Sequence, residues 1–353
     1  MRGRSIHELL RDYQDARGRE RELPKELARR LADYERFVRS RSHVFQRDPA
    51  QVFAQGVAQP RDSAVGADFR RLVEEKHGPE RPWLQLRNVP ETDTQRNLLA
   101  TIEIGTKVNA VAWVKFRGKP CALAGCDDGC LRLYDLGTGL LVEPILRGHT
   151  REVTAVALAP DGGHALSASW DGTLRWWDLA AGRCLRTLEG HTDRVRALAL
   201  APDGGHALSG SADSTLRWWD LGAGRCLHTL KGHNGSVRAV ALAPDGGHAL
   251  SGSWDGTLRW WDLGPGRCLH ALEGHTKRVS GVALSPDGGH ALSGSSDGTL
   301  RWWDLDSGRC LAVFTCDFPV TAVALSPQRP YLAVAGDSRG RVYFFDVVES
   351  DKE

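Results

Sequence analysis

The sequence has no apolar run long enough to cross a membrane. A spanning helix needs about 20 consecutive apolar residues, and no stretch approaches that length. The first seven residues also lack the hydrophobic core of a secretory signal. Both absences favour a soluble, cytoplasmic protein with no membrane partner.

A strong charge of one sign is missing too. The chain carries 46 basic and 44 acidic side chains, a net charge of +2, which argues against a surface devoted entirely to nucleic acid. Apolar residues make up 41% of the sequence, enough to bury a core and to exclude wholesale disorder. The 353 residues are enough for several average domains or for one large β domain with a leader.

Nucleotide and metal motifs are absent as well. No Gly-x-x-x-x-Gly-Lys-Ser/Thr loop occurs, which excludes a phosphate-binding loop of that type. Cys121, Cys126 and Cys130 lie close together, but no second pair or His completes a zinc site. Four further cysteines recur once per repeat, too far apart to bridge: Cys184, Cys226, Cys268 and Cys310. We expect reduced thiols, no metal and no cofactor.

From residue 98 onward the chain is periodic. Gly-His pairs begin at residues 148, 190, 232 and 274, and Trp-Asp pairs begin at 177, 219, 261 and 303, so both recur every 42 residues. Within one unit, four strands are expected over residues 153–158, 164–169, 173–179 and 183–188, separated by turns such as Asp171-Gly172. A period near 42 made of short strands predicts propeller blades.

With Gly-His opening each unit and Trp-Asp closing the third strand, this region resembles the WD-repeat family of β-propellers. Four consecutive units carry every signature residue, whereas the flanking copies read Tyr134-Asp135 and Phe345-Asp346 in place of Trp-Asp. The resemblance implies a mainly β fold and a non-catalytic binding module. It also implies closure of the ring by a strand from the N-terminal side.

Counting strands indicates six blades. Six groups of three inner strands can be placed, and the chain has no outer strand after Val347. We therefore expect a propeller over residues 98–353, with residues 98–104 supplying the missing strand. Seven blades are the alternative, but a seventh would need residues 50–97, whose prolines and helical pattern oppose it.

Residues 1–97 form the predicted leader. They carry four more basic than acidic residues, and helices are expected over 6–16, 24–46 and 66–77. The arginines here are interpreted as solvated helix faces, with an RNA-binding arm as the alternative. The leader resembles the helical linker between the nucleotide switch and the WD-repeat sensor of bacterial NACHT-type (STAND) signalling ATPases. It carries the phrases Ser42-His43-Val44-Phe45, Phe53-Ala54-Gln55, Ala58-Gln59-Pro60 and Arg81-Pro82-Trp83-Leu84. The resemblance implies a sensor without its ATPase, and a signalling ATPase among the partners.

Each full unit repeats a His, a Ser, an Asp and a Trp. Ser, His and Asp together suggest a hydrolase, but a catalytic site occurs once, whereas this set occurs four times at one spacing. The resemblance implies a buried hydrogen-bond chain from Trp through Ser and His to Asp. We therefore expect no enzyme, and a hydrolase in the propeller channel is the disfavoured alternative. The sets are His149, Ser167, Asp171, Trp177; His191, Ser209, Asp213, Trp219; His233, Ser251, Asp255, Trp261; and His275, Ser293, Asp297, Trp303.

A second set of histidines follows Gly-Gly in each unit: His164, His206, His248 and His290. Because they recur at one position, they are expected to form a ring around the propeller. Such a ring could bind a metal or sense pH. Solvated residues at strand starts are the favoured interpretation.

The four central units are the same at 26 of 42 positions, so the positions that differ show where the scaffold makes no demand. They cluster just after Gly-His and just before the tight turn, and a milder second cluster lies in the turn before the outer strand, on the opposite rim. The resemblance places the first cluster on the top face, around the channel mouth, where partners of the family bind. The expected partner-binding residues are Lys107, Asn109, Asp127, Glu152, Thr154, Trp170, Arg194, Arg196, Arg238, Trp254, Arg278 and Ser280.

The residue types at these positions indicate the ligand. Trp and Arg dominate the energetics of protein interfaces, and drift alone would not enrich them. A basic mouth that carries Trp suits an acidic or phosphorylated peptide or protein loop. Single-stranded nucleic acid is the second choice, because bases also stack on Arg and aromatic side chains.

Overall fold

The structure is a computed structural model that describes residues 83–86, 102, 104–327 and 332–348. In these residues 24 strands form six four-stranded sheets, and none of these residues is helical. Each sheet is one blade. The helices expected over 6–16, 24–46 and 66–77 fall outside the described residues.

The first three blades follow the chain without interruption. Blade 1 contains β2 (Val108–Phe116), β3 (Lys119–Cys126), β4 (Leu131–Asp135) and β5 (Leu141–Leu146). Blade 2 contains β6 (Val153–Leu158), β7 (His164–Ser169), β8 (Leu174–Asp178) and β9 (Arg183–Leu188). Blade 3 contains β10 (Val195–Leu200), β11 (His206–Ser211), β12 (Leu216–Asp220) and β13 (Arg225–Leu230).

The last three blades continue the pattern, with one exception. Blade 4 contains β14 (Val237–Leu242), β15 (His248–Ser253), β16 (Leu258–Asp262) and β17 (Arg267–Leu272). Blade 5 contains β18 (Val279–Leu284), β19 (His290–Ser295), β20 (Thr299–Asp304) and β21 (Arg309–Thr315). Blade 6 contains β22 (Val320–Leu325), β23 (Leu332–Asp337), β24 (Val342–Val348) and, as its outer strand, β1 (Trp83–Leu86).

The mainly β propeller predicted from the sequence is confirmed, and the strands of the central units begin and end within a residue of the expected positions. The strands of every blade are antiparallel, and the register repeats: His164 lies opposite Asp178, His206 opposite Asp220 and His248 opposite Asp262. The repeat therefore fixes both the strands and their pairing.

The outer strand of blade 6 differs from the expectation. The sequence assigned this place to residues 98–104, but the structure pairs β1 with β24, with Trp83 opposite Val348 and Leu86 opposite Phe345. A β-ladder is made by backbone groups that every segment carries. A short strand pattern therefore does not identify which of two segments adds to an edge.

The core lies between neighbouring blades. Between blades 3 and 4, for example, Leu208 and Leu216 pack with Val237 and Trp261, and all four side chains are buried. Similar clusters lie between blades 1 and 2, 2 and 3, and 4 and 5. Because joined blades bury the apolar faces that they turn towards each other, they form one continuous unit.

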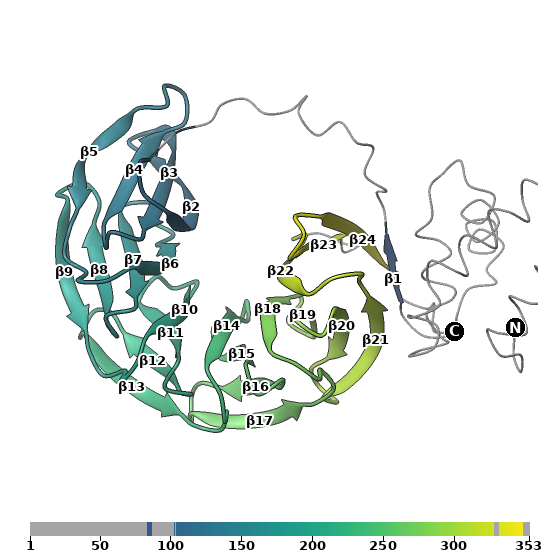
Figure 1. Cartoon of the computed structure of the whole chain (residues 1–353). Coiled ribbons are helices and arrows are strands. Elements are labelled where there is room, and N and C mark those ends of the chain that lie inside the picture. The colour runs from purple at the N-terminus through teal and green to yellow at the C-terminus, as the bar shows by residue number, and fades with distance from the viewer. Residues whose placement is uncertain (1–82, 87–101, 103, 328–331, 349–353) are drawn as a thin grey trace, which may run out of the picture.

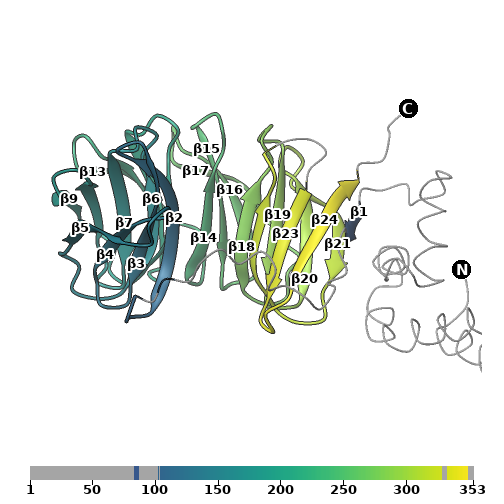
Figure 2. The same ribbon diagram turned by 90° about the horizontal axis from the view of Figure 1, so that it is seen from above.

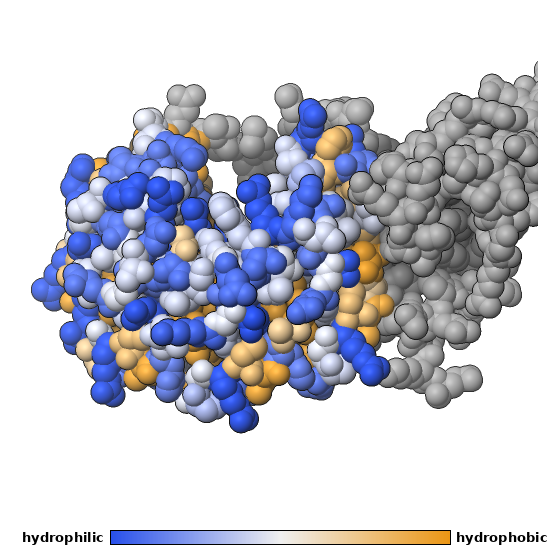
Figure 3. Space-filling view, turned by 60° about the horizontal axis from the view of Figure 1, so that its bottom comes forward, coloured by the Kyte–Doolittle hydropathy of each residue, from blue (hydrophilic) through white to orange (hydrophobic). Residues whose placement is uncertain are grey.

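The blades follow one another around a central axis in chain order (Figure 1). Their first strands lie towards the centre and pack in the order β2, β6, β10, β14, β18 and β22. The ribbon is open between blade 1 and blade 6 (Figure 1), and the edge-on view in Figure 2 shows the blades standing side by side in a thick disc. The space-filling view shows a largely hydrophilic surface with a notch between the two ends of the ring (Figure 3).

Candidate functional site

One backbone hydrogen bond in every blade brings the variable residues together on one rim. The N–H of Trp170 donates to the Glu152 carbonyl at 3.0 Å, and the N–H of Trp254 donates to the Ser236 carbonyl at 2.9 Å. The same bond recurs in the other four blades. It joins the residue before the inner strand to the residue before the tight turn. Two of the positions that vary among the units are thus held side by side at the channel rim.

We call this rim the mouth. It contains all twelve residues singled out in the sequence, together with their counterparts in other blades. By blade, its members are Lys107, Asn109 and Asp127; Glu152, Thr154 and Trp170; Arg194, Arg196 and Ala212; Ser236, Arg238 and Trp254; Arg278, Ser280 and Ser296; and Pro319, Thr321 and Ser338.

Arginines surround both tryptophans of the mouth. The Arg194 guanidinium carbon lies 4.3 Å from the Trp170 ring centroid, and that of Arg196 lies 5.7 Å from it. Arg196 also lies 5.6 Å from the Trp254 centroid, and Arg238 and Arg278 lie 6.0 and 5.7 Å from the same centroid. Arg196, from blade 3, is therefore shared by tryptophans of blades 2 and 4. Trp254 nevertheless remains 44% exposed, which leaves its ring available to a partner.

The positive charge of the mouth is only partly compensated. Burial and then the charge of Arg194 lower the pKa of Arg196, against an opposing effect of Asp193. Burial and then repulsion from Arg196 and Arg278 lower the pKa of Arg238. Among the described residues, neither the buried Nε of Arg196 nor the buried Ser236 hydroxyl has a hydrogen-bond partner. The hydrogen-bonding capacity of both groups is therefore unused within the described residues.

A cavity of about 610 Å³ opens beside this cluster, across blades 4, 5 and 6. It is lined by three cations, four hydroxyls and one indole: Arg238, Lys277, Arg278, Ser280, Ser296, Thr321, Ser338 and Trp254, with Pro319 and Val320 completing the wall. None of these lining residues is acidic. The cavity is large enough for a side chain of a partner with its charged group.

The acidic residues of the mouth lie on blades 1 and 2. Glu152 is 3.7 Å from the Nε of Arg151, and Asp127 accepts a hydrogen bond from the Asn109 amide at 3.1 Å. The mouth is therefore polarised, and its arginines on blades 3 to 5 form no ion pair with a carboxylate of the described residues.

Three of the twelve residues singled out in the sequence also join blades. The Asn109 amide donates to the Val153 carbonyl at 3.2 Å, and the Thr154 hydroxyl donates to the Val195 carbonyl at 2.7 Å. The Ser280 hydroxyl donates to the Val320 carbonyl at 2.7 Å. In blades 3 and 4 the same position holds Arg196 and Arg238, whose longer side chains reach into the mouth instead.

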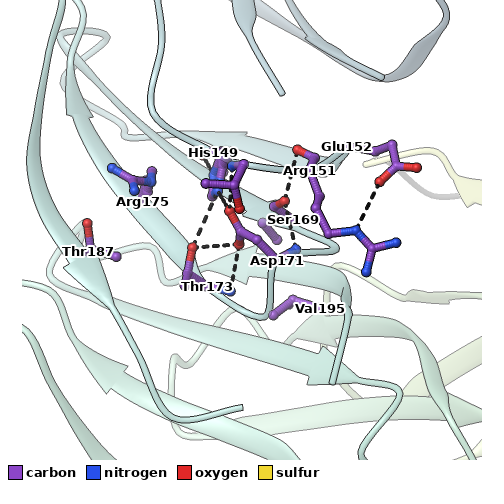
Figure 4. A network of polar contacts seen from close by, with 12 residues as sticks. His149, Arg151, Glu152, Ser169, Asp171, Thr173, Arg175, Thr187 and Val195 are labelled. Carbon is purple, nitrogen blue, oxygen red and sulfur yellow. Dashed lines mark hydrogen bonds and ion pairs between the residues drawn. The ribbon is translucent and has the colours of Figure 1, made fainter. Parts of the chain in front are cut away.

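The repeated His, Ser, Asp and Trp form a chain of hydrogen bonds inside each of blades 2 to 5. In blade 2 the Trp177 indole donates to the Ser167 hydroxyl at 2.8 Å, and that oxygen lies 2.7 Å from Nε2 of His149. Nδ1 of His149 lies 2.8 Å from Asp171, on which the hydroxyl of Thr173 also converges (Figure 4). With His149 donating from Nδ1, its Nε2 accepts the serine proton, and every group is satisfied.

The other three sets share this geometry, with Trp to Ser at 2.8 Å and Ser to His at 2.7 or 2.8 Å. Burial by itself raises the pKa of Asp171, Asp213, Asp255 and Asp297, but the hydrogen bonds they accept hold each pKa well below its usual range. Their serines are fully buried and already accept from an indole. A substrate carbonyl cannot reach them, so these sets cannot act as a hydrolytic site.

The histidines that follow Gly-Gly lie on the opposite rim. His164 stacks on Trp176 with 5.4 Å between ring centroids, and its Nδ1 lies 2.7 Å from Asp161. His206, His248 and His290 stack in the same way. Each is therefore held within its own blade, at the first residue of a strand.

Some features of the described residues bear on other functions. All eight cysteines are free thiols. Within the part of the chain that the structure covers, no three His, Cys, Asp or Glu side chains gather where they could hold a metal ion. In the same part, the search for a helix of the length and apolarity needed to span a membrane finds none.

The partner-binding set expected from the sequence leaves out several residues in the mouth or beside it. Arg151 lies 5.6 Å from the Trp170 centroid, and Lys277 lines the cavity. Both occupy a position that differs in all four central units, and that variability was the available signal. Thr321 and Ser338 belong to the degenerate last unit, where only the strand register reveals their equivalence to residues of other blades.

The sequence was compared with a protein-family profile and with known proteins. The profile of the family described as "WD domain, G-beta repeat" matches residues 142–178, 182–220, 224–262, 266–304 and 308–346. The chain is 56% identical over 41 residues to the small ribosomal subunit protein RACK1 of Drosophila melanogaster, covering 12% of this chain and 13% of that protein. It is 39% identical over 85 residues to the WD repeat-containing protein RUP2 of Arabidopsis thaliana, covering 23% and 22%. The matched segments thus span less than a quarter of these relatives.

Proposed function

Because this chain belongs to the WD-repeat family, we propose that it is a scaffold or sensor whose mouth binds an acidic or phosphorylated segment of a partner protein. Repeats of this family support a protein-interaction role, and the mouth supplies the specificity. The near-identical blades form a stiff platform, and the few residues that differ among them recognise the partner.

The observation that carries this proposal is the group of cations on blades 3 to 5. Arg196, Arg238 and Arg278 lie around one indole, Trp254, and burial together with the charges of Arg196 and Arg278 lowers the pKa of Arg238. Assembling like charges without carboxylate partners costs free energy in the unbound protein. A bound carboxylate or phosphate would remove this repulsion and form charge-assisted hydrogen bonds.

The tryptophans add apolar contact area next to these charges. Trp254 is 44% exposed and borders the cavity, so a partner side chain can cover its ring. Buried Trp and Arg at the centre of an interface commonly contribute about 2 kcal/mol or more each. Trp254 and Arg238 are therefore the residues on which binding should depend most.

The binding test uses purified protein and immobilised peptides. Three peptides of one acid-poor sequence would be compared: unmodified, phosphorylated at one serine, and with glutamates flanking that serine. We expect the charged peptides to bind, and the double variant Arg238→Ala/Trp254→Ala to lose at least tenfold in affinity with an unchanged unfolding midpoint. A matched control, Arg183→Ala/Arg225→Ala, removes two exposed arginines from outer strands and should bind normally. Full binding by the mouth variant would contradict the proposal.

Single-stranded nucleic acid is the second candidate, because stacked Arg and Trp also hold unpaired bases. Binding to phosphates releases counterions, so affinity for an oligonucleotide should fall steeply with salt. A gel shift of a 20-nucleotide strand across a salt series separates the two. No retained complex at low salt would end the nucleic-acid hypothesis.

The leader adds a prediction about the kind of partner. Its resemblance to the linker of NACHT-type ATPases favours a signalling ATPase as one binding partner, in the cytoplasm. Co-purification of the full chain with such an ATPase would support this, and its absence from captured complexes would count against it.

A further inference from the structure

One hairpin of blade 1 carries two cysteines directly opposite each other. Strand β3 ends at Cys126, and Cys130 immediately precedes β4. The register that pairs Gly125 with Leu131 continues to these cysteines, and the Cys126 N–H donates to the Cys130 carbonyl at 3.0 Å. Side chains of directly opposite residues lie on the same face of a sheet. The two thiols therefore share one face of the hairpin, on either side of its tight turn.

The backbone at this turn suits a disulfide. Opposite residues joined by a ladder hydrogen bond have Cα atoms about 5.5 Å apart, and a disulfide bridges Cα atoms about 4.4 to 6.8 Å apart. Both cysteines are free thiols in the structure. The strands therefore need not separate or slide for the two sulfur atoms to meet.

The cysteine pair is specific to blade 1. Blades 2 to 5 carry Ser and Thr at the two positions, for example Ser169 and Thr173, which close the same turn. There the hydroxyls stabilise the turn, because Ser169 accepts from the Asp171 N–H at 3.1 Å and Thr173 donates to the Asp171 carboxylate at 2.7 Å. The two thiols of blade 1 instead donate to carbonyls at 3.8 and 3.9 Å. The double replacement gives up the hydroxyl bonds of the turn, and a chemical role of the thiols accounts for it.

Guanidinium groups flank both sulfur atoms. Nη1 of Arg147 lies 3.5 Å from the Cys130 sulfur, and Arg132 is held next to the pair by two hydrogen bonds to Asp128, at 2.6 and 3.1 Å. Burial raises the pKa of both thiols and Asp128 adds to the rise, whereas Arg132 acts against it at both and Arg147 at Cys130. Cations beside a sulfur stabilise the thiolate, which is the form that attacks a disulfide.

The two thiols differ in access. Cys126 is completely buried, whereas Cys130 is 6% exposed. The arginine that contacts the Cys130 sulfur, Arg147, is itself exposed, so movement of one surface side chain opens a path to that sulfur. A reagent from solution therefore meets Cys130 first, and Cys126 lies in place to react second.

We propose that Cys126 and Cys130 are a redox-active pair, which a small-molecule disulfide such as glutathione disulfide converts into a disulfide across the tight turn of blade 1. First, the Cys130 thiolate attacks one sulfur of the reagent, whose S–S bond breaks, and one glutathione leaves with the proton that Cys130 lost. The Cys126 thiolate then attacks the Cys130 sulfur, and the second glutathione leaves with the proton of Cys126. The protein loses two electrons and two protons, and one reagent molecule is reduced to two thiols.

The bridge would lie next to the blade 1 side of the mouth. The turn that it spans carries Asp127, whose N–H donates to the Lys107 carbonyl at 2.9 Å. Oxidation would therefore fix the turn on which both mouth residues depend. The proposal does not rest on what the mouth binds.

The test measures the bridge in the folded full chain. The protein is incubated with glutathione disulfide at pH 8, and the remaining thiols are blocked in denaturant at low pH with N-ethylmaleimide. Trypsin releases a single peptide, residues 118–132, that contains Cys121, Cys126 and Cys130. We expect labelling of Cys126 and Cys130 to fall by about tenfold or more, with a peptide lighter by two hydrogens per bridge and the label retained on Cys121. Dithiothreitol should restore all three labels.

Three variants separate the roles of the cysteines. Cys126→Ser and Cys130→Thr introduce the residues that blades 2 to 5 carry, so both should unfold near the wild-type midpoint. Cys126→Ser should retain one glutathione on Cys130, because the second thiol is missing, and Cys130→Thr should remain fully labelled. Cys121→Ala is the matched control, since it removes a third buried cysteine of the same peptide, and it should form the bridge as the wild type does.

Unchanged labelling of the wild type overturns the proposal, and so does a bridge that includes Cys121. A bridge that forms only in denaturant also overturns it, because the native hairpin would then not bring the thiols together. Glutathione on Cys126 in the Cys130→Thr variant contradicts the assigned order of attack. The wild-type peptide alone decides whether the bridge forms, so the result does not depend on how well the variants fold.

Discussion

Trp219 donates its indole N–H to the Ser209 hydroxyl at 2.8 Å in the interior of blade 3, where both side chains are almost completely buried. The serine oxygen also lies 2.7 Å from Nε2 of His191. One hydroxyl therefore satisfies two buried nitrogens. Its removal affects more than a single hydrogen bond.

Ser209→Ala should lower the free energy of unfolding by about 2 kcal/mol, because it leaves two buried polar groups without partners. Trp219→Ala should cost about 3 to 5 kcal/mol, since it also opens a large cavity. Thr192→Ala, on an exposed residue of the same blade, serves as the control. Chemical denaturation monitored by far-UV circular dichroism measures all three. Equal effects of Ser209→Ala and Thr192→Ala would contradict the role given to the network.

The stability of the propeller should fall in acid. The pKa values of Asp171, Asp213, Asp255 and Asp297 are held well below the unfolded value of about 3.9. The unfolded chain then binds more protons below about pH 4, so the stability that these carboxylates contribute is present above pH 4 and lost as the pH falls further. Burial also lowers the pKa of His275, which acts in the same direction from about pH 6.5 downward.

Asp213→Asn tests this dependence. The variant should be less stable at pH 7 and should lose less stability than the wild type between pH 5 and pH 2. Urea titrations at four pH values in that range provide the comparison. A wild-type stability that is flat or rises towards pH 2 would show that these carboxylates do not govern acid unfolding.

Ser214 should be a site of backbone strain. Its φ is 68°, in the left-handed region, and the same turn position holds glycine in the neighbouring units, with φ of 82° at Gly172 and 84° at Gly256. Glycine adopts this conformation without the steric cost that a β-carbon imposes. Ser214→Gly should therefore raise the free energy of unfolding by about 0.5 to 1 kcal/mol. The reverse change, Gly256→Ser, should lower it, and equal midpoints for both variants would disprove the strain.

The arginines of the mouth should lower the stability of the unbound protein. Arg238→Gln removes one of the mutually repelling guanidinium groups, so we expect a small gain in thermal stability at low salt, a few tenths of a kcal/mol at an exposed site. Salt screens this repulsion, and the gain should vanish near 1 M sodium chloride. Arg225→Gln, at an exposed outer strand, is the comparison. A gain that persists at high salt would indicate a cause other than charge.

Much of the fold could be predicted because its signal is repeated. The residue types of His149 and Trp177 recur every 42 residues. A correct prediction of the strands in one unit therefore applies to all four. The first and last repeats are degenerate and carry a weaker signal. There the structure differs from the expectation, because β1, rather than residues 98–104, pairs with β24. Pairing through backbone groups leaves little trace in a four-residue strand.

The rim on which the variable residues gather could be predicted, whereas the contacts between their side chains could not. Comparing the units identifies Arg196 and Trp254 as residues at positions where the repeat does not require one residue type. The rim on which they gather follows from the blade symmetry. The sequence does not reveal that Arg196 lies near two tryptophans, or that the Thr154 hydroxyl donates a hydrogen bond to the Val195 carbonyl. These facts depend on side-chain reach across neighbouring blades.

The sequence by itself determined the blade: its four strands, its turns and the polar network that joins Trp219 to His191, because all of these are local and recur with the repeat. Only the tertiary structure decided which cations have no ion-pair partner and which blade faces are not covered by a neighbouring blade. Gly294 and Gly336 occupy equivalent positions in their repeats, yet one lies against Val320 and the other meets only its own blade. That difference arises between blades, where a repeat cannot specify what comes before its first copy or after its last.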